Sequence, residues 1–279
     1  MSDTPTPNKR NKKLILSYIM LIIGAAAIAV CAYGIIRQII TQDQAQSFYA
    51  SVSPSAPAAP ARQSILKLPM LGSAETAGPA EEEPAPAPFA PDFASLREIM
   101  PGLTAWILCE GTPIDFPVVQ GRDNDYYLHR LPNGNKNSLG SIFMDYRNKA
   151  DFSDQNTLIF GHHVKGGLMF GSLNNYKYQD YYDQHPTMMF YTPDKTYVLE
   201  LFAGYVLDSG FEVPPFNFKS AASFDQYIAK LKRRSYFKSE LVPVFGDQLI
   251  TLVTCDYSFT NARFMLVGKL TEIPAATAE

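Results

Sequence analysis

The first clear pattern along the chain is an uncharged apolar run over residues 14–36. This run of 23 residues follows a cluster of four basic residues, and Arg37 ends it. At a rise of about 1.5 Å per residue, a helix over this run spans roughly 34 Å, enough to cross a hydrocarbon layer of about 30 Å. The pattern therefore predicts a transmembrane helix.

The distribution of basic residues around this run predicts its orientation. The cluster lies within residues 1–13, and no Lys or Arg occurs between Arg37 and Arg62. By the positive-inside rule, residues 1–13 form a cytoplasmic tail and residues 14–36 a signal anchor, with the rest of a single-pass cell-membrane protein outside. A cleaved signal peptide has a shorter apolar region and a small-residue cleavage site, and a buried core helix does not explain the basic flank.

Residues 37–91 are expected to form an extracytoplasmic linker. Within them, residues 51–91 contain nine prolines, many alanines and an acidic triplet at residues 81–83. Such a composition cannot bury enough apolar surface to fold and predicts a semi-rigid spacer. The apolar patch at residues 65–71 interrupts the pattern, and whether it docks on the following domain is left open.

Residues 92–273 show the pattern of a folded, mainly β domain, with residues 274–279 as a C-terminal tail. Short runs rich in Val, Ile, Phe, Tyr and Thr alternate with turn residues, and eight such runs with few helices predict a closed or nearly closed barrel. The runs cover residues 105–109, 116–120, 140–144, 157–160, 188–191, 197–205, 248–254 and 263–270.

Two helices are expected beside these strands. Residues 94–100 form a short one, which Pro101 and Gly102 end. A longer amphipathic helix is predicted between the sixth and seventh strands, because its apolar residues recur at i, i+3, i+4 and i+7 from Phe224 to Leu231. Ser223 and Gln226 have the spacing of a capping box before it.

Composition narrows the classes of function. The net charge is only −3, and the basic residues do not alternate with aromatic residues along a stripe, so we expect no nucleic-acid partner. The three cysteines, Cys31, Cys109 and Cys255, do not form the dense pairs of a disulfide framework. For a protein expected outside the cytoplasm, unpaired cysteines raise the question of thiol chemistry.

Cys255 lies where an apolar strand gives way to a polar turn, a position that is rigid and yet reaches solvent. A nucleophile and a small hydrophobic side chain at the mouth of the barrel fit this position equally well. Arg263 begins the next strand. If the two strands pair, its guanidinium lies near the thiol and can favour the thiolate or hold an oxyanion. A surface arginine at a strand start is the alternative.

A third strand ends in Gly161, His162 and His163, followed by a glycine-containing loop. A histidine at a strand end can approach a cysteine at another strand end, and only one of two adjacent residues on an extended chain can face it. The other histidines, His129 and His185, complete no metal-ligand spacing, so we predict no metal site and no cofactor.

These motifs resemble those of a known family. The segment TLVTC at residues 251–255 resembles the TLxTC signature of sortases, Gly161-His162 is similar to their catalytic-histidine motif, and Arg263 stands where the family arginine is expected. Further stretches are similar to class B sortases in particular, and the resemblance covers roughly residues 92–272. These stretches are WILCEGTPIDFPVVQ (106–120), DNDYYL (123–128), GSIFMDYRN (140–148) and MFGSL (169–173).

The resemblance implies an eight-stranded sortase barrel and a membrane-anchored cysteine transpeptidase. In that interpretation, Cys255 is the nucleophile, His162 the acid/base and Arg263 the oxyanion stabiliser. The thiolate attacks the bond after Thr in the C-terminal sorting signal of secreted surface proteins. An amine from a peptidoglycan precursor or from a pilin subunit then resolves the acyl-enzyme.

The same resemblance implies substrate-binding residues. Asn124 and Leu128 match the groove asparagine and leucine of the family, and Thr254 and Asp256, which flank the nucleophile, are further candidates. Cys109 is interpreted as a core residue. Two other functions remain possible from the residues alone: a Cys–His peptidase of the cell wall that uses water as acceptor, and a non-catalytic, membrane-tethered surface binding module.

Overall fold

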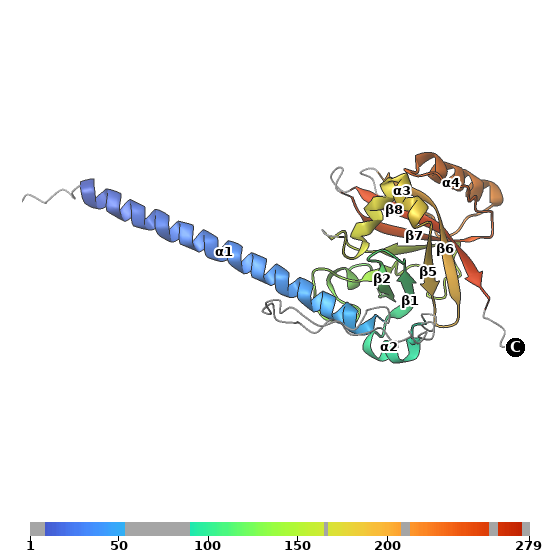
Figure 1. Ribbon diagram of the computed structural model, residues 1–279, viewed down its shortest axis with the longest axis horizontal. Coiled ribbons are helices and arrows are strands. Elements are labelled where there is room, and N and C mark those ends of the chain that lie inside the picture. The colour runs from blue at the N-terminus through green and yellow to red at the C-terminus, as the bar shows by residue number, and fades with distance from the viewer. Residues whose placement is uncertain (1–8, 54–89, 165–166, 208–212, 257–261, 275–279) are drawn as a thin grey trace, which may run out of the picture. The chain divides into compact units, whose positions relative to one another are not determined.

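The computed structural model describes residues 9–53, 90–164, 167–207, 213–256 and 262–274 (Figure 1). It divides into two compact units, residues 1–48 and residues 49–279. The apolar patch at residues 65–71, most of the predicted linker and nearly all of the predicted C-terminal tail lie outside the described residues.

The first unit contains most of α1, Lys9–Val52, which includes the predicted anchor at residues 14–36. The helix is long and apolar enough to cross a membrane, and its large apolar side chains are exposed, as at Leu21 and Ile28. Helical structure does not end at Ile36 as expected. It continues through residues 37–52, the beginning of the predicted linker, because no Gly or Pro occurs between Gly34 and Pro54.

The second unit is built on an eight-stranded closed barrel, as the sequence predicts. The order around the barrel is β1-β2-β3-β4-β7-β8-β6-β5, and β1 closes it by pairing with β5. All pairs are antiparallel except β2 with β3 and β4 with β7. The strands are β1 Leu103–Leu108, β2 Asp115–Gln120, β3 Ile142–Met144, β4 Asn156–Phe160, β5 Thr187–Tyr191, β6 Thr196–Leu207, β7 Gln248–Cys255 and β8 Arg263–Ile273.

The strand β7 and the first part of β8 are buried on both faces, which explains their nearly continuous apolar sequences. Ile250 and Leu252 of β7 belong to the core inside the barrel, whereas Leu249 and Val253 pack in a second cluster on its outer face. The helix α4, Ala221–Arg234, covers that outer face (Figure 1).

The helix α4 lies between β6 and β7, as predicted, and buries Phe224, Ile228 and Leu231. Its cap differs from the expected pair, because Ser220 and Ser223, rather than Ser223 and Gln226, form the capping box. The helix therefore begins three residues earlier than the apolar stripe suggests. The other short helices are α2 Phe93–Ile99, η1 Tyr127–His129, η2 Phe170–Lys177 and α3 Gln179–Gln184.

The end of α1 belongs to the barrel unit. The Tyr49 ring packs edge-on against Phe116 with a centroid distance of 5.2 Å, and its hydroxyl donates to the Gly140 carbonyl at 3.3 Å. Ser53 also donates to the Asp115 carboxylate. Residues 49–53 thus pack on the barrel ahead of residue 92, the expected start of the folded domain.

Candidate active site

The predicted catalytic residues lie at the ends of three neighbouring strands, β4, β7 and β8. The parallel strands β4 and β7 end at the same edge of the barrel, where Phe160 pairs with Val253. The antiparallel strand β8 begins there, so Cys255 and Arg263 are direct cross-strand partners. Directly opposite residues of antiparallel strands point to the same face with Cβ atoms about 4.5–5.5 Å apart. The eight-residue spacing in the sequence therefore makes Cys255 and Arg263 direct neighbours on adjacent strands, and both line one groove.

Arg263 lies at this edge of the barrel. Its side chain is half-buried, and Nη1 donates to the neighbouring Ala262 carbonyl at 3.1 Å. Within the described ranges of the chain, Arg263 takes part in no ion pair. A half-buried guanidinium without a carboxylate partner is suited to an anion that appears only during a reaction.

His162 follows β4 and lines the same groove as Cys255. Its Nε2 lies 2.8 Å from the Leu128 carbonyl oxygen. Because a carbonyl oxygen only accepts hydrogen bonds, Nε2 carries a proton and Nδ1 is the nitrogen left for proton transfer in the neutral ring. Gly161 is required beside it, since an added Cβ would lie 2.5 Å from the Ile142 side chain and 2.6 Å from that of Phe170.

His163 is directed to a different atom. Its Nδ1 lies 3.0 Å from the carbonyl oxygen of Cys255 and 2.7 Å from the Asn174 amide. A hydrogen bond to the carbonyl oxygen requires a proton on Nδ1. A protonated Nδ1 can only donate, so the Asn174 amide fits when its oxygen, and not its nitrogen, faces the ring. His163 therefore supports the backbone at the end of β7 and is not among the residues that line the groove.

The groove has a volume of about 390 Å³ and contains six of the seven predicted site residues. Those six are Cys255, His162, Arg263, Asn124, Leu128 and Thr254. The complete lining is Asn124, Leu128, Phe143, Arg147, Phe160, Gly161, His162, Val253, Thr254, Cys255 and Arg263. The lining thus combines apolar side chains with the polar groups of Asn124, Arg147 and Arg263.

Asp256, the seventh residue, is not placed in the groove. Its side chain is 2% exposed and forms an ion pair with Lys177 of η2. The Lys177 ammonium also lies 5.9 Å from the centroid of the Phe264 ring. The position next to Cys255 suggested a groove residue, but the Asp256 side chain pairs with Lys177 and so connects the end of β7 to η2.

Asn124 is held in a fixed orientation by both ends of its amide. Its Nδ2 donates to Asp145 at 3.0 Å, and its Oδ1 accepts from the Tyr146 N–H at 3.0 Å. Arg147 donates twice to the Asp145 carboxylate, at 2.9 and 2.7 Å. Burial raises the pKa of Asp145, but the hydrogen bonds from Arg147 and Asn124 outweigh it and hold the pKa below its ordinary value.

Arg147 is a groove residue that the sequence reasoning missed. It lies within the stretch of residues 140–148 that resembles class B sortases, but nothing in the local pattern separates it from a surface arginine. Its pairing with Asp145 depends on a turn after β3, because the Arg147 N–H also donates to Asp145. A short Asp-x-Arg spacing after a buried strand was the available signal.

Cys109 is a core residue, as predicted. It is 2% exposed, and its Sγ lies 3.7 Å from the Tyr176 hydroxyl and 3.7 Å from the Thr187 carbonyl oxygen. Burial raises the pKa of this thiol. Within the described ranges, no group of three or more His, Cys, Asp or Glu residues is arranged to hold a metal ion.

Comparison with known proteins identifies what this arrangement resembles. A family model described as the Sortase domain matches residues 108–271. Sortase B of Listeria monocytogenes serovar 1/2a is 35% identical over 181 residues, which cover 64% of this chain and 74% of the relative.

Solved structures match in the same region. A Staphylococcus aureus sortase B–substrate complex has a TM-score of 0.62 and 32% identity, with 65% of this chain and 85% of that chain covered. A sortase B complexed with triglycine has a TM-score of 0.62 and 32% identity, with 65% of this chain and 86% of that chain covered. The similarity thus spans the barrel and its groove.

Proposed function

Because the chain belongs to the sortase family and is a class B cysteine transpeptidase, we propose that Cys255, His162 and Arg263 cleave a C-terminal sorting signal after Thr and transfer the product to an amine. The observation that carries this proposal is the cross-strand pair of Cys255 and Arg263, with His162 in the same groove.

The proposed acylation step uses each of the three side chains once. The Cys255 thiolate attacks the carbonyl carbon of the Thr residue, and the carbonyl oxygen becomes an oxyanion that Arg263 stabilises. Protonated His162 gives its proton to the leaving amine, the C–N bond breaks and a thioester remains on Cys255. A neutral thiol is a weak nucleophile, and the thiolate is the reactive form. Positive charge near the sulfur favours the thiolate.

The second step reverses the proton transfer. An incoming amine attacks the thioester carbonyl, His162 accepts the amine proton, and the Cys255 thiolate leaves as the new amide bond forms. The proposed acceptor is an amine of a peptidoglycan precursor or of a pilin subunit. The triglycine in the sortase B complex carries a terminal amine of this kind.

The proposed substrate site is the groove around Asn124, Leu128 and Thr254. Leu128 and the apolar residues Phe143 and Phe160 provide contact surface, and the locked Asn124 amide provides directed polar atoms. A relative from Staphylococcus aureus binds a substrate in complex, which supports a peptide in this groove.

We also propose that α1 anchors the enzyme as a single-pass protein with its N-terminus in the cytoplasm and the barrel outside. The support is the length and apolarity of α1 and the basic cluster that precedes the apolar run. This location would bring the barrel to the side of the membrane where secreted proteins and cell-wall precursors meet.

The test is a peptide assay with the full-length protein in a neutral detergent. A panel of sorting-signal peptides is incubated with and without triglycine, and mass spectrometry identifies the products. We expect cleavage after Thr and a triglycine-linked product, and Cys255→Ala should yield neither. Hydrolysis alone at saturating triglycine would indicate a peptidase, and no cleavage after Thr in any peptide would overturn the proposed specificity.

A further inference from the structure

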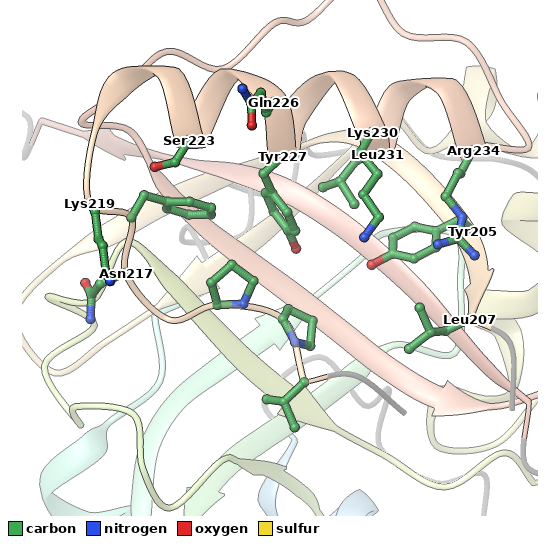
Figure 2. A pocket seen from close by; sticks show the side chains of 14 residues that line it. Tyr205, Leu207, Asn217, Lys219, Ser223, Gln226, Tyr227, Lys230, Leu231 and Arg234 are labelled. Atoms are coloured by element: carbon green, nitrogen blue, oxygen red, sulfur yellow. The ribbon is translucent and has the colours of Figure 1, made fainter. Parts of the chain in front are cut away.

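A second cleft, of about 420 Å³, lies on the outer face of the barrel beside α4 and shares no lining residue with the active-site groove. One wall is α4 and the facing wall is the segment at residues 213–219 (Figure 2). The end of β6 contributes Tyr205 and Leu207. The three proposed catalytic residues, Cys255, His162 and Arg263, are absent from its described lining.

The charged residues that the structure describes in the lining of this cleft are all cations. Lys219, Lys230 and Arg234 line it, and no Asp or Glu is found among its described lining residues. Within the described part of the chain, none of the three takes part in an ion pair. Figure 2 shows the Lys230 and Arg234 side chains reaching from α4 toward Tyr205, and Lys219 at the opposite end beside Asn217.

Arg234 is held in a defined orientation. Its guanidinium carbon lies 5.4 Å from the centroid of the Tyr205 ring, and Nη2 approaches the Val206 carbonyl at 3.5 Å. A guanidinium has five N–H donors, so this single long contact leaves most of them for a ligand. Lys230 precedes Arg234 by four residues and therefore lies on the same helix face.

The helix itself does not account for this set of cations. A helix C-terminus favours positive charge, which explains Arg234 in the last turn of α4. Lys230 and Arg234 nevertheless repel each other at i and i+4, and Lys219 precedes the N-terminus, where the helix dipole disfavours a cation. A concave site lined by charge of one sign concentrates anions of the opposite sign.

We propose that this cleft binds a phosphate ester, with the phosphate between Lys230 and Arg234 and the organic part against Leu207, Pro214 and the Tyr227 ring. Arginine matches phosphate oxygens with its planar fork, and lysine adds a point charge. A phosphate monoester carries close to two negative charges at neutral pH and so balances both cations, whereas a carboxylate carries one. The volume is in the range of sites for small ligands, roughly 300–1,000 Å³.

The cleft is a neighbour of the active site without being part of it. Leu207, in its wall, pairs across β6 and β8 with Arg263, which in turn pairs with Cys255. Because the two sites share no lining residue, ligand binding to this cleft can be measured separately from peptide cleavage. The proposal does not depend on the proposed sorting-signal activity.

The test is calorimetric titration of the full-length protein in an uncharged detergent. Glycerol 3-phosphate is the soluble probe, dihexanoylphosphatidic acid the lipid probe, and dihexanoylphosphatidylcholine the zwitterionic control. We expect at least one of the two anionic probes to bind and the control not to bind. The variants Lys230→Gln and Arg234→Gln should each weaken binding about tenfold or more, with peptide cleavage unchanged.

Arg233→Gln is the matched control, because Arg233 is exposed on the same helix turn but does not line the cleft. It should bind the probes as the unmodified protein does. Stronger binding of the lipid probe would identify a lipid headgroup as the source of the phosphate, and equal or weaker binding would identify a soluble ester. No binding of either anionic probe, or equal weakening by Arg233→Gln and Lys230→Gln, would overturn the proposal.

Discussion

Replacement of Arg263 by alanine is the sharpest perturbation of the proposed mechanism. Arg263 pairs directly with Cys255 across β7 and β8, and the proposed mechanism assigns its guanidinium to the oxyanion of the tetrahedral intermediate. Loss of one such donor typically costs about 10²–10³ in kcat, or about 2.7–4 kcal/mol of transition-state stabilisation. We therefore expect Arg263→Ala to slow acylation by about that factor.

The effect of Arg263→Ala on the free energy of unfolding should be much smaller. Arg263 is half-buried and donates a hydrogen bond to the adjacent Ala262 carbonyl, so truncation leaves no buried carboxylate without its cation among the described residues. The net contribution of one hydrogen bond to the free energy of unfolding is about 0.5–1.5 kcal/mol. Arg263→Lys should recover little activity, because an ammonium on a flexible stem does not reproduce a planar fork.

The measurement is single-turnover acylation with a sorting-signal peptide, with circular dichroism to monitor folding. Arg233→Ala, on the exposed surface of α4, is the matched arginine control and should acylate normally. A folded Arg263→Ala variant that acylates within a few fold of the unmodified protein would refute the oxyanion role. Cys255 and His162 would then act as a simple dyad.

Three further outcomes follow from the same account. His162→Ala should reduce peptide turnover by several orders of magnitude and His163→Ala far less, because His163 is bonded to the Cys255 carbonyl and the Asn174 amide and does not line the groove; steady-state assays that give the reverse ranking would contradict this assignment. Peptide mapping after brief treatment with iodoacetamide should show Cys255 alkylated and Cys109 protected, since burial hides Cys109 and raises its pKa; equal labelling would be inconsistent with a core role. External protease on intact cells should release the barrel by cutting within residues 51–91, whereas complete protection until lysis would exclude the proposed topology.

The sequence predicted the barrel and the positions of Cys255 and Arg263 at strand ends because both depend on local patterns. The β-branched, apolar stretch before Cys255 is typical of a buried strand, and Arg263 begins the next one. The stripe from Phe224 to Leu231 likewise predicts α4, because three of its four members are buried against the sheet. The periodicity of apolar residues predicts a strand or a helix from the segment alone, whatever the segment packs against.

The features that the sequence did not predict depend on where the chain turns. Asp256 follows a strand end, where the backbone leaves the ladder, and its side chain turns to Lys177 instead of the groove. Arg147 enters the groove only because the turn after β3 folds it onto Asp145. The helix α1 continues past Ile36 because its polar residues form no local stop signal, and hydropathy alone ends a membrane span but not a helix.

The central claim is that Cys255 forms a covalent thioester with the peptide fragment that ends in Thr. The direct measurement is intact-mass and peptide-mapping spectrometry of the full-length protein, quenched in acid during turnover without an added amine. We predict an adduct with the mass of the N-terminal product, located on Cys255, released by hydroxylamine and absent from Cys255→Ala. Turnover without such an adduct, or an adduct on Cys109, would contradict the account.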